Sequence, residues 1–180
     1  MKNFFVVFSS FVLAVSLISC CPKSKQTVLG TWETNIVLKS DLAEPSPTGD
    51  SIKAFLYTKQ DIVLSFAEGG VYTKKVLQEV DRVEFINSSE DVQAAKEYFS
   101  KFCNKNLVFN GEYDQKKSII VFEVRNVQSG DDEPLDYNEF FEKDPSIGDD
   151  YYCENYDLID GALYLNGVKF KKLENKNSAD

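Results

Sequence analysis

Short runs in which apolar and polar residues alternate dominate the chain after residue 28. Ile62, Leu64 and Phe66, for example, occupy every second position of segment 61–66. Such alternation is typical of a β-strand with one buried face. The pattern predicts strands over Trp32–Leu38, Ile52–Thr58, Asp61–Phe66, Val71–Val80, Leu107–Tyr113, Ser118–Val127, Tyr151–Ile159, Leu163–Leu165 and Val168–Leu173. Arg82–Ile86 is either a continuation of the fourth strand past a bulge or a separate short strand.

Residues that favour turns separate these strands. Glu68-Gly69-Gly70, Asp160-Gly161 and Asn166-Gly167 each predict a tight hairpin connection. The longest polar connection is Ser40–Ser51, twelve residues that include two prolines and a glycine. We expect a loop there, and loops of this length tend to be functional.

The period of the pattern changes between residues 89 and 103. Val92, Ala95 and Phe99 recur at helical spacing. Ser88 or Ser89 is a suitable N-cap, because a hydroxyl can accept a hydrogen bond from the free amides of the first turn. The sequence therefore predicts one helix, over about residues 89–103, packed against the outside or one end of the sheet.

The first 21 residues follow a different pattern. Lys2 precedes an uncharged, mostly apolar run of 15 residues, Phe4–Ile18. A membrane-spanning helix needs about 20 apolar residues, so the run fits the apolar part of a secretory signal peptide better. We expect a signal peptide over residues 1–19.

The end of this run, Leu17-Ile18-Ser19-Cys20, resembles the lipobox of bacterial lipoproteins. The resemblance implies that Cys20 becomes the mature N-terminus and carries a diacylglyceryl thioether, with palmitate as a typical chain. Cys21 could serve instead, but Cys20 would then precede the cut, where a small residue is preferred. Residues 20–27 would form a short tether to a membrane of the bacterial cell envelope, at the outer membrane or the periplasmic face.

Charge and composition argue against several function classes. Lys2 is the only charged residue of the predicted signal peptide, so its removal changes the formal net charge from −9 to −10. A chain this acidic is not expected to bind nucleic acid. Histidine is absent, so neither a Ser-His nor a Cys-His pair can form. We expect no enzymatic activity, no cofactor and no metal centre.

Cys103 and Cys153 remain beyond the lipobox. In an exported protein we expect them to form a disulfide between the end of the helix and a distant strand. Closing a loop of this length would stabilise the fold by about 4 kcal/mol. Two buried free thiols are the alternative.

Strands joined mostly by hairpins indicate an antiparallel up-and-down meander that closes into a barrel of about 8–10 strands. We expect one domain over residues 28–173 and a disordered tail over 174–180. A β-sandwich that does not close is the alternative.

Short motifs in this domain resemble those of the lipocalins and related calycins. Gly30-Thr31-Trp32 resembles their G-x-W motif, and Gly69–Thr73 resembles a hairpin of bacterial lipocalin-like lipoproteins. The resemblance implies that Trp32 plugs the closed end of the barrel and that Ser40–Ser51 covers the open mouth. Two features depart from it. Most lipocalins pack a late arginine on this tryptophan, whereas no arginine follows Arg125, and here the helix interrupts the strands.

A lipocalin-like barrel would bind a small apolar or amphipathic ligand in its interior. The aromatic residues predicted to line it are Phe66, Tyr72, Tyr113, Phe122, Tyr152 and Phe170. The same residues could fill a dry core, because barrels of about eight strands lie at the boundary between a filled and a hollow interior.

The acidic region 128–160 suggests a second hypothesis. Residues 126–160 hold 12 acidic residues and one basic residue, Lys143. This region is expected to be a solubilising surface or a contact for a cationic protein partner, and its spacing does not match a calcium-binding EF-hand loop. The protein would then be a filled-barrel structural or interaction module. A tight turn at Asp81-Arg82 would place this region and the predicted mouth at one end of the barrel, whereas a continuous strand would place them at opposite ends.

Overall fold

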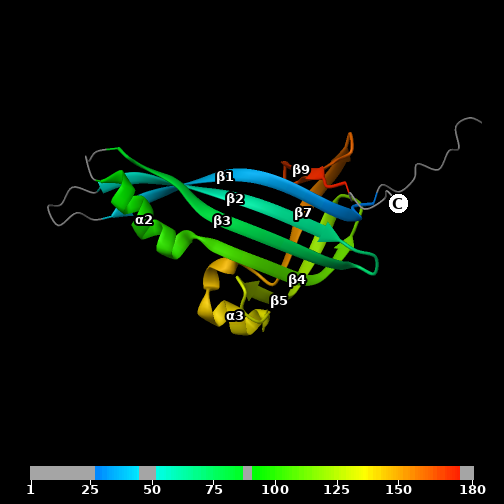
Figure 1. Ribbon diagram of the computed structural model, residues 1–180. Helices are drawn as coiled ribbons and strands as arrows, with labels where there is room; N and C mark the ends of the chain where they lie inside the picture. The colour runs from blue at the N-terminus through cyan, green and yellow to red at the C-terminus, as the bar shows by residue number, and fades with distance from the viewer. Residues whose placement is uncertain (1–26, 45–51, 87–90, 175–180) are drawn as a thin grey trace, which may run out of the picture.

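Eight antiparallel strands close into a barrel in the computed structural model, which describes residues 27–44, 52–86 and 91–174 (Figure 1). The barrel order is β1-β2-β3-β4-β5-β7-β8-β9, and β9 returns to β1. The elements are β1 (Gly30–Glu44), β2 (Ile52–Phe66), β3 (Val71–Phe85), α2 (Val92–Cys103), β4 (Lys105–Gln115), β5 (Ile119–Ser129), β6 (Leu135–Asp136), α3 (Tyr137–Lys143), the 3₁₀ helix η1 (Pro145–Ile147), β7 (Tyr151–Ile159), β8 (Ala162–Leu165) and β9 (Val168–Lys172).

Closure of the sheet confirms the predicted barrel over the β-sandwich. β1 pairs with β9 through Trp32↔Lys172 and Glu33↔Lys171. The hairpins at Asp160-Gly161 and Asn166-Gly167 also form as predicted. The first residue of each turn has a positive φ, 50° at Asp160 and 46° at Asn166, as a type I′ hairpin turn requires.

The first three strands are longer than the sequence pattern predicts. β2 is continuous through Gln60, which pairs with Ile36 on one side and Gln78 on the other, so the predicted division into two strands is wrong. β1 likewise continues to Glu44, so residues 40–44 of the predicted loop belong to a strand. The strand ends immediately before Pro45, a residue without a backbone N–H to donate. Residues 45–51 lie outside the described part of the chain.

A β-bulge at Asp81 keeps β3 continuous. Thr58 pairs with Val80 and Tyr57 with Arg82, so one residue of β3 is left over between them. Val80 and Val83 are consequently both buried on the same side. The first alternative for Arg82–Ile86, continuation past a bulge, is confirmed.

The strands β1, β2 and β3 are longer than the others and extend beyond the closed barrel as a three-stranded sheet. The helix α2 covers this extension (Figure 1). Ala95, Phe99 and Cys103 pack against an apolar cluster of the extension, Ala54, Leu56, Val80 and Val83. The helix begins at Val92 rather than near residue 89, and its N-cap is Asp91, whose carboxylate accepts from the amides of Gln93 and Ala94. The predicted caps, Ser88 and Ser89, lie outside the described residues.

A second helix, α3, lies within the acidic region 128–160. Tyr137 and Phe140 of α3 pack with Leu107, Val124 and Val127. The helix therefore covers the part of β5 that no longer pairs with β7. β1, β3 and β5 run in the same direction, which places α2 and residues 130–150 at the end of the strands opposite Trp32. The sequence analysis expects a continuous β3 to place the acidic region and the predicted mouth at opposite ends of the barrel. This expectation is wrong, because β2 is continuous as well and the number of strands between the two regions changes by one.

Candidate ligand-binding cavity

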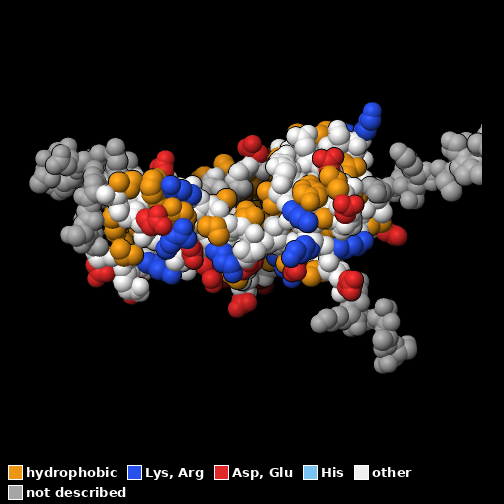
Figure 2. Space-filling view, turned by 90° about the horizontal axis from the view of Figure 1, so that it is seen from above, with side chains coloured by type: hydrophobic (Ala, Val, Ile, Leu, Met, Phe, Trp, Pro, Cys, Tyr) orange, Lys and Arg blue, Asp and Glu red, His pale blue; other side chains and the backbone are white. Residues whose placement is uncertain are grey.

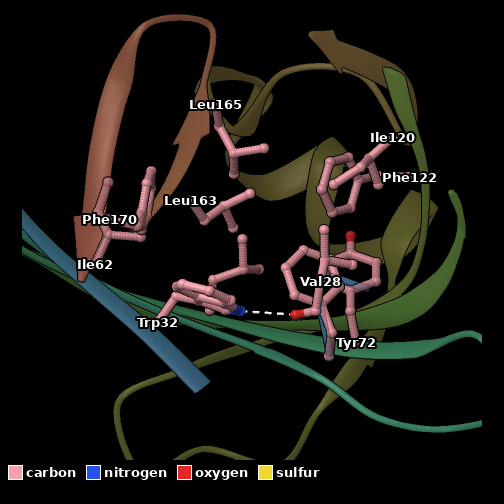
Figure 3. Packing of buried hydrophobic residues seen from close by; sticks show 11 residues of the cluster. Val28, Trp32, Ile62, Tyr72, Ile120, Phe122, Leu163, Leu165 and Phe170 are labelled. Atoms are coloured by element: carbon pink, nitrogen blue, oxygen red, sulfur yellow. Dashed lines mark hydrogen bonds between the residues drawn. The ribbon is translucent and has the colours of Figure 1, made fainter. Parts of the chain in front are cut away.

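The end of the barrel at which the described chain begins is packed solid around Trp32 (Figure 3). The Trp32 side chain is 2% exposed, and its Nε1 donates to the Val28 carbonyl oxygen at 2.7 Å. The Lys172 ammonium, from the last strand, lies 5.3 Å from the centre of the indole ring. The basic residue that packs on Trp32 is therefore a lysine of β9.

Aromatic rings fill the adjacent layer of the barrel. Phe66 meets Tyr113 edge to face with ring centroids 4.8 Å apart, and Tyr72 meets Phe122 in the same way at 4.9 Å. Phe122 in turn stacks on Tyr152 at 4.9 Å. This half of the interior is a packed core.

The other half is hollow. An inner cavity of ≈180 Å³ lies inside the barrel, with apolar walls that include Ile36, Ile62 and Leu165. A second cavity of ≈530 Å³, called the mouth cavity below, lies between the end of α2 and η1, where Phe102 and Ile147 contribute to its walls. Ile62 and Lys74 line both cavities, so the two cavities are adjacent at these side chains.

The structure divides the six predicted lining residues into two groups. Phe122, Tyr152 and Phe170 line the inner cavity. The other three belong to the packed layer, where Phe66 is 4% and Tyr72 1% exposed and Tyr113 packs beside them. The inner cavity is therefore bounded on one side by the aromatic core.

Two charged side chains that the sequence analysis does not single out also line the inner cavity. They are Lys74 from β3 and Glu154 from β7. Neither makes a hydrogen bond or an ion pair with any residue in the described ranges, although the Lys74 ammonium lies 5.6 Å from the centre of the Tyr152 ring. Burial lowers the pKa of the Lys74 amine and raises that of the Glu154 carboxyl, and the charge of each partner opposes these shifts.

Two tyrosines accompany this pair. Desolvation raises the pKa of Tyr72 to about 12, and it raises the pKa of Tyr152 as well. The two hydroxyls interact, but Tyr72 Oη is fully enclosed and has no hydrogen bond of normal geometry to the described residues. The cavity wall thus combines apolar surface with a small polar group of side chains.

Strand periodicity explains why these polar residues point inward. Tyr72, Lys74 and Val76 occupy alternate positions of β3, as Tyr152 and Glu154 do on β7. A charged residue in phase with buried aromatic residues is a sequence signal that could have identified both.

Polar contacts fix both sides of the mouth. Lys105 Nζ lies 2.6 Å from Asp144 Oδ2 and also donates to Ser146 Oγ, which holds η1 against β4. On the other side Gln78 Nε2 donates to the Cys103 carbonyl oxygen at 2.6 Å, which holds the end of α2.

The predicted disulfide is absent from the structure, in which Cys103 and Cys153 are both free thiols. Cys103 lines the mouth cavity, whereas Cys153 is an exposed residue of β7 between the inward-facing Tyr152 and Glu154. The two side chains therefore lie on opposite sides of the barrel wall, which prevents the bond from forming.

Several acidic residues of the 128–160 region have structural partners. The Asp136 carboxylate caps α3, and that of Asp144 accepts from the Ser146 amide at the start of η1. Asp131, Asp132 and Glu133 are exposed. Among the residues that the structure describes, no group of three or more acidic or cysteine side chains is arranged to hold a metal ion.

Within the described ranges, no helix is long and apolar enough to cross a membrane. The predicted signal peptide, the lipobox and Cys20 precede these ranges, and most of the predicted tail follows them. Comparisons of the chain with known protein families, with curated proteins and with solved structures find no match.

Proposed function

We propose that the protein is a lipid-anchored, lipocalin-like protein of the bacterial envelope that binds a small amphipathic molecule inside its barrel. The observation that carries the proposal is the inner cavity of ≈180 Å³, whose apolar walls surround the side chains of Lys74 and Glu154. Ligand sites are typically apolar hollows with a few polar groups that fix orientation. The adjacent mouth cavity, between α2 and η1, is the proposed route of entry.

The proposed anchor fits this arrangement. Residue 28 and the end of β9 lie at the packed end of the barrel, where the Leu173 amide donates to the Thr31 carbonyl oxygen. A lipid on Cys20 would hold this end near the bilayer, because seven residues separate Cys20 from Val28. The mouth would face away from the anchoring membrane, so the ligand would be exchanged with the aqueous space or with another protein.

A pair of substitutions on one strand tests the binding site. Ile36→Phe places a larger side chain in the inner cavity, whereas Val37→Phe makes the same kind of change on the opposite face of β1, where Val37 is 53% exposed. The uncharged fluorescent probe N-phenyl-1-naphthylamine should bind the wild-type and Val37→Phe proteins equally. Its binding should be lost in Ile36→Phe. Equal binding by all three proteins would refute the interior site.

The acidic region supports a second proposal, a contact with a cationic protein partner. Asp131, Asp132 and Glu133 are consecutive and exposed, and they form no ion pair with the described residues. The triple variant Asp131→Asn, Asp132→Asn and Glu133→Gln leaves the Asp136 helix cap intact. It should weaken binding to a cationic partner and reduce the salt dependence of that binding. Unchanged binding would rule out this contact.

A further inference from the structure

The two charged residues of the inner cavity face the same space without touching. Lys74 and Glu154 both line it and interact electrostatically, yet they form no ion pair within 4.0 Å. They are also the only charged side chains among the residues lining the inner cavity. Lys105, at the mouth, is already paired with Asp144. The inner cavity therefore offers one positive and one negative group with no net charge.

This pairing constrains the ligand. A carboxylate placed at Lys74 would also lie near the carboxylate of Glu154, and an ammonium group placed at Glu154 would lie near Lys74. Both arrangements bring like charges together in a poorly hydrated space, where their repulsion is strong. A neutral group that accepts a hydrogen bond from Lys74 and donates one to Glu154 satisfies both residues at once, and neither has a hydrogen-bond or ion-pair partner among the described residues.

We propose that the ligand is an uncharged amphiphile whose polar group, such as an amide or a hydroxyl, bridges Lys74 and Glu154 while its apolar part lies against the walls of the cavity. This inference rests on the proposed function and adds the chemical class of the ligand. The opposite shifts in the pKa of the two residues agree with it, because burial disfavours the charge on each.

Three ligands with the same tail test the proposal by titration calorimetry at neutral pH: octanamide, octanoate and octylamine. Wild-type protein should bind octanamide at least tenfold more tightly than either ion. Glu154→Gln leaves Lys74 unopposed, so octanoate should gain affinity. Lys74→Met leaves Glu154 unopposed, so octylamine should gain affinity. Both variants preserve the approximate shape of the side chain.

Two results would overturn the proposal. Octanoate could bind the wild-type protein most tightly and lose affinity in Lys74→Met, which would show a simple anion site. Alternatively, neither substitution could change the order of affinities, which would place the polar group elsewhere. Ile36→Phe separates these results from failure of the interior site itself. If it abolishes binding of all three ligands, the cavity is the site whichever head group is preferred.

Discussion

The ammonium of Lys172 lies 5.3 Å from the centre of the Trp32 ring, at the place where the last strand of the barrel meets the first. Trp32 and Lys172 are also paired residues of β1 and β9, the two strands that close the sheet. The cation therefore packs on the aromatic ring at the seam of the barrel. Such an interaction is typically worth about 0.5–1 kcal/mol at an exposed site.

Lys172→Met should lower the free energy of unfolding by about 0.5–1 kcal/mol, because it removes the charge over the indole ring and keeps most of the aliphatic stem. Lys171→Met, a neighbouring substitution on the other face of β9, is the matched control and should have little effect. Urea unfolding followed by fluorescence measures both, since Trp32 is the only tryptophan in the chain. Equal effects of the two substitutions would show that the ring contact does not stabilise the barrel.

Gly111 allows β4 and β5 to approach each other. A Cβ at this position would lie 2.0 Å from the Glu123 carbonyl oxygen and 3.0 Å from the Tyr72 ring. Gly111→Ala should therefore destabilise the protein by about 2–3 kcal/mol, as overpacking does. A Cβ at Gly130 would meet no other atom, so the only cost of Gly130→Ala is the positive φ of 57°. This substitution should lower the free energy of unfolding by about 1 kcal/mol. Thermal unfolding of the two variants should reproduce this order, and the reverse order would contradict it.

The ion pair at the mouth predicts a pH dependence. Burial tends to raise the pKa of the Asp144 carboxyl, but hydrogen bonds from Lys105 and Ser146 and the charge of Lys105 outweigh it and bring the pKa below its usual value of 3.8. A lowered pKa in the folded state stabilises the protein above the ordinary carboxyl pKa, and this contribution is lost as the pH falls through the folded value.

Stability measured between neutral pH and pH 2 should consequently fall more steeply for the wild type than for Lys105→Met below about pH 4. The comparison isolates this carboxyl from the other acidic residues, which both proteins share. Parallel curves would show that the Lys105–Asp144 pair does not contribute.

The two free thiols should differ in their response to ligand. Cys103 lines the mouth cavity, and Cys153 is exposed on the outer surface of the barrel wall. Octanamide or another bound ligand should slow the reaction of Cys103 with a thiol reagent and leave that of Cys153 unchanged. Peptide mapping after timed labelling measures both rates. Protection of Cys153 as well, or of neither, would contradict the assigned mouth.

The sequence pattern predicts the barrel well where the alternation is regular and the turns are tight. The Asp160-Gly161 and Asn166-Gly167 hairpins form as predicted because few other connections tolerate their backbone angles. It fails at Lys59-Gln60 and at residues 40–44, where polar residues are read as a turn or a loop. At Lys59-Gln60, β2 pairs with both β1 and β3, whereas residues 40–44 of β1 pair with β2 alone. Apolar residues under α2 support this end of the strands, and all these contacts come from distant parts of the chain.

Prediction of the candidate site from the sequence has the same limits. Phe122, Tyr152 and Phe170 can be identified as inward-facing aromatic residues, but the sequence does not show how far the packed core extends into the barrel. The disulfide prediction is wrong because the spacing of two cysteines does not reveal on which side of the wall each one lies. Figure 2 shows another feature that the sequence pattern does not predict. Hydrophobic side chains are exposed among acidic and basic ones at the end of the molecule that carries the three-stranded extension.

Native mass spectrometry tests the central claim, an accessible cavity inside the barrel, most directly. All strands of the closed barrel lie within the described residues, so residues 22–180 contain the whole fold. This protein would be incubated with an organic-solvent extract of the source organism and then compared with its Ile36→Phe variant. We predict a discrete adduct that disappears on denaturation and is missing from the variant. A bare mass for the wild-type protein, or the same adduct on Ile36→Phe, would contradict the account.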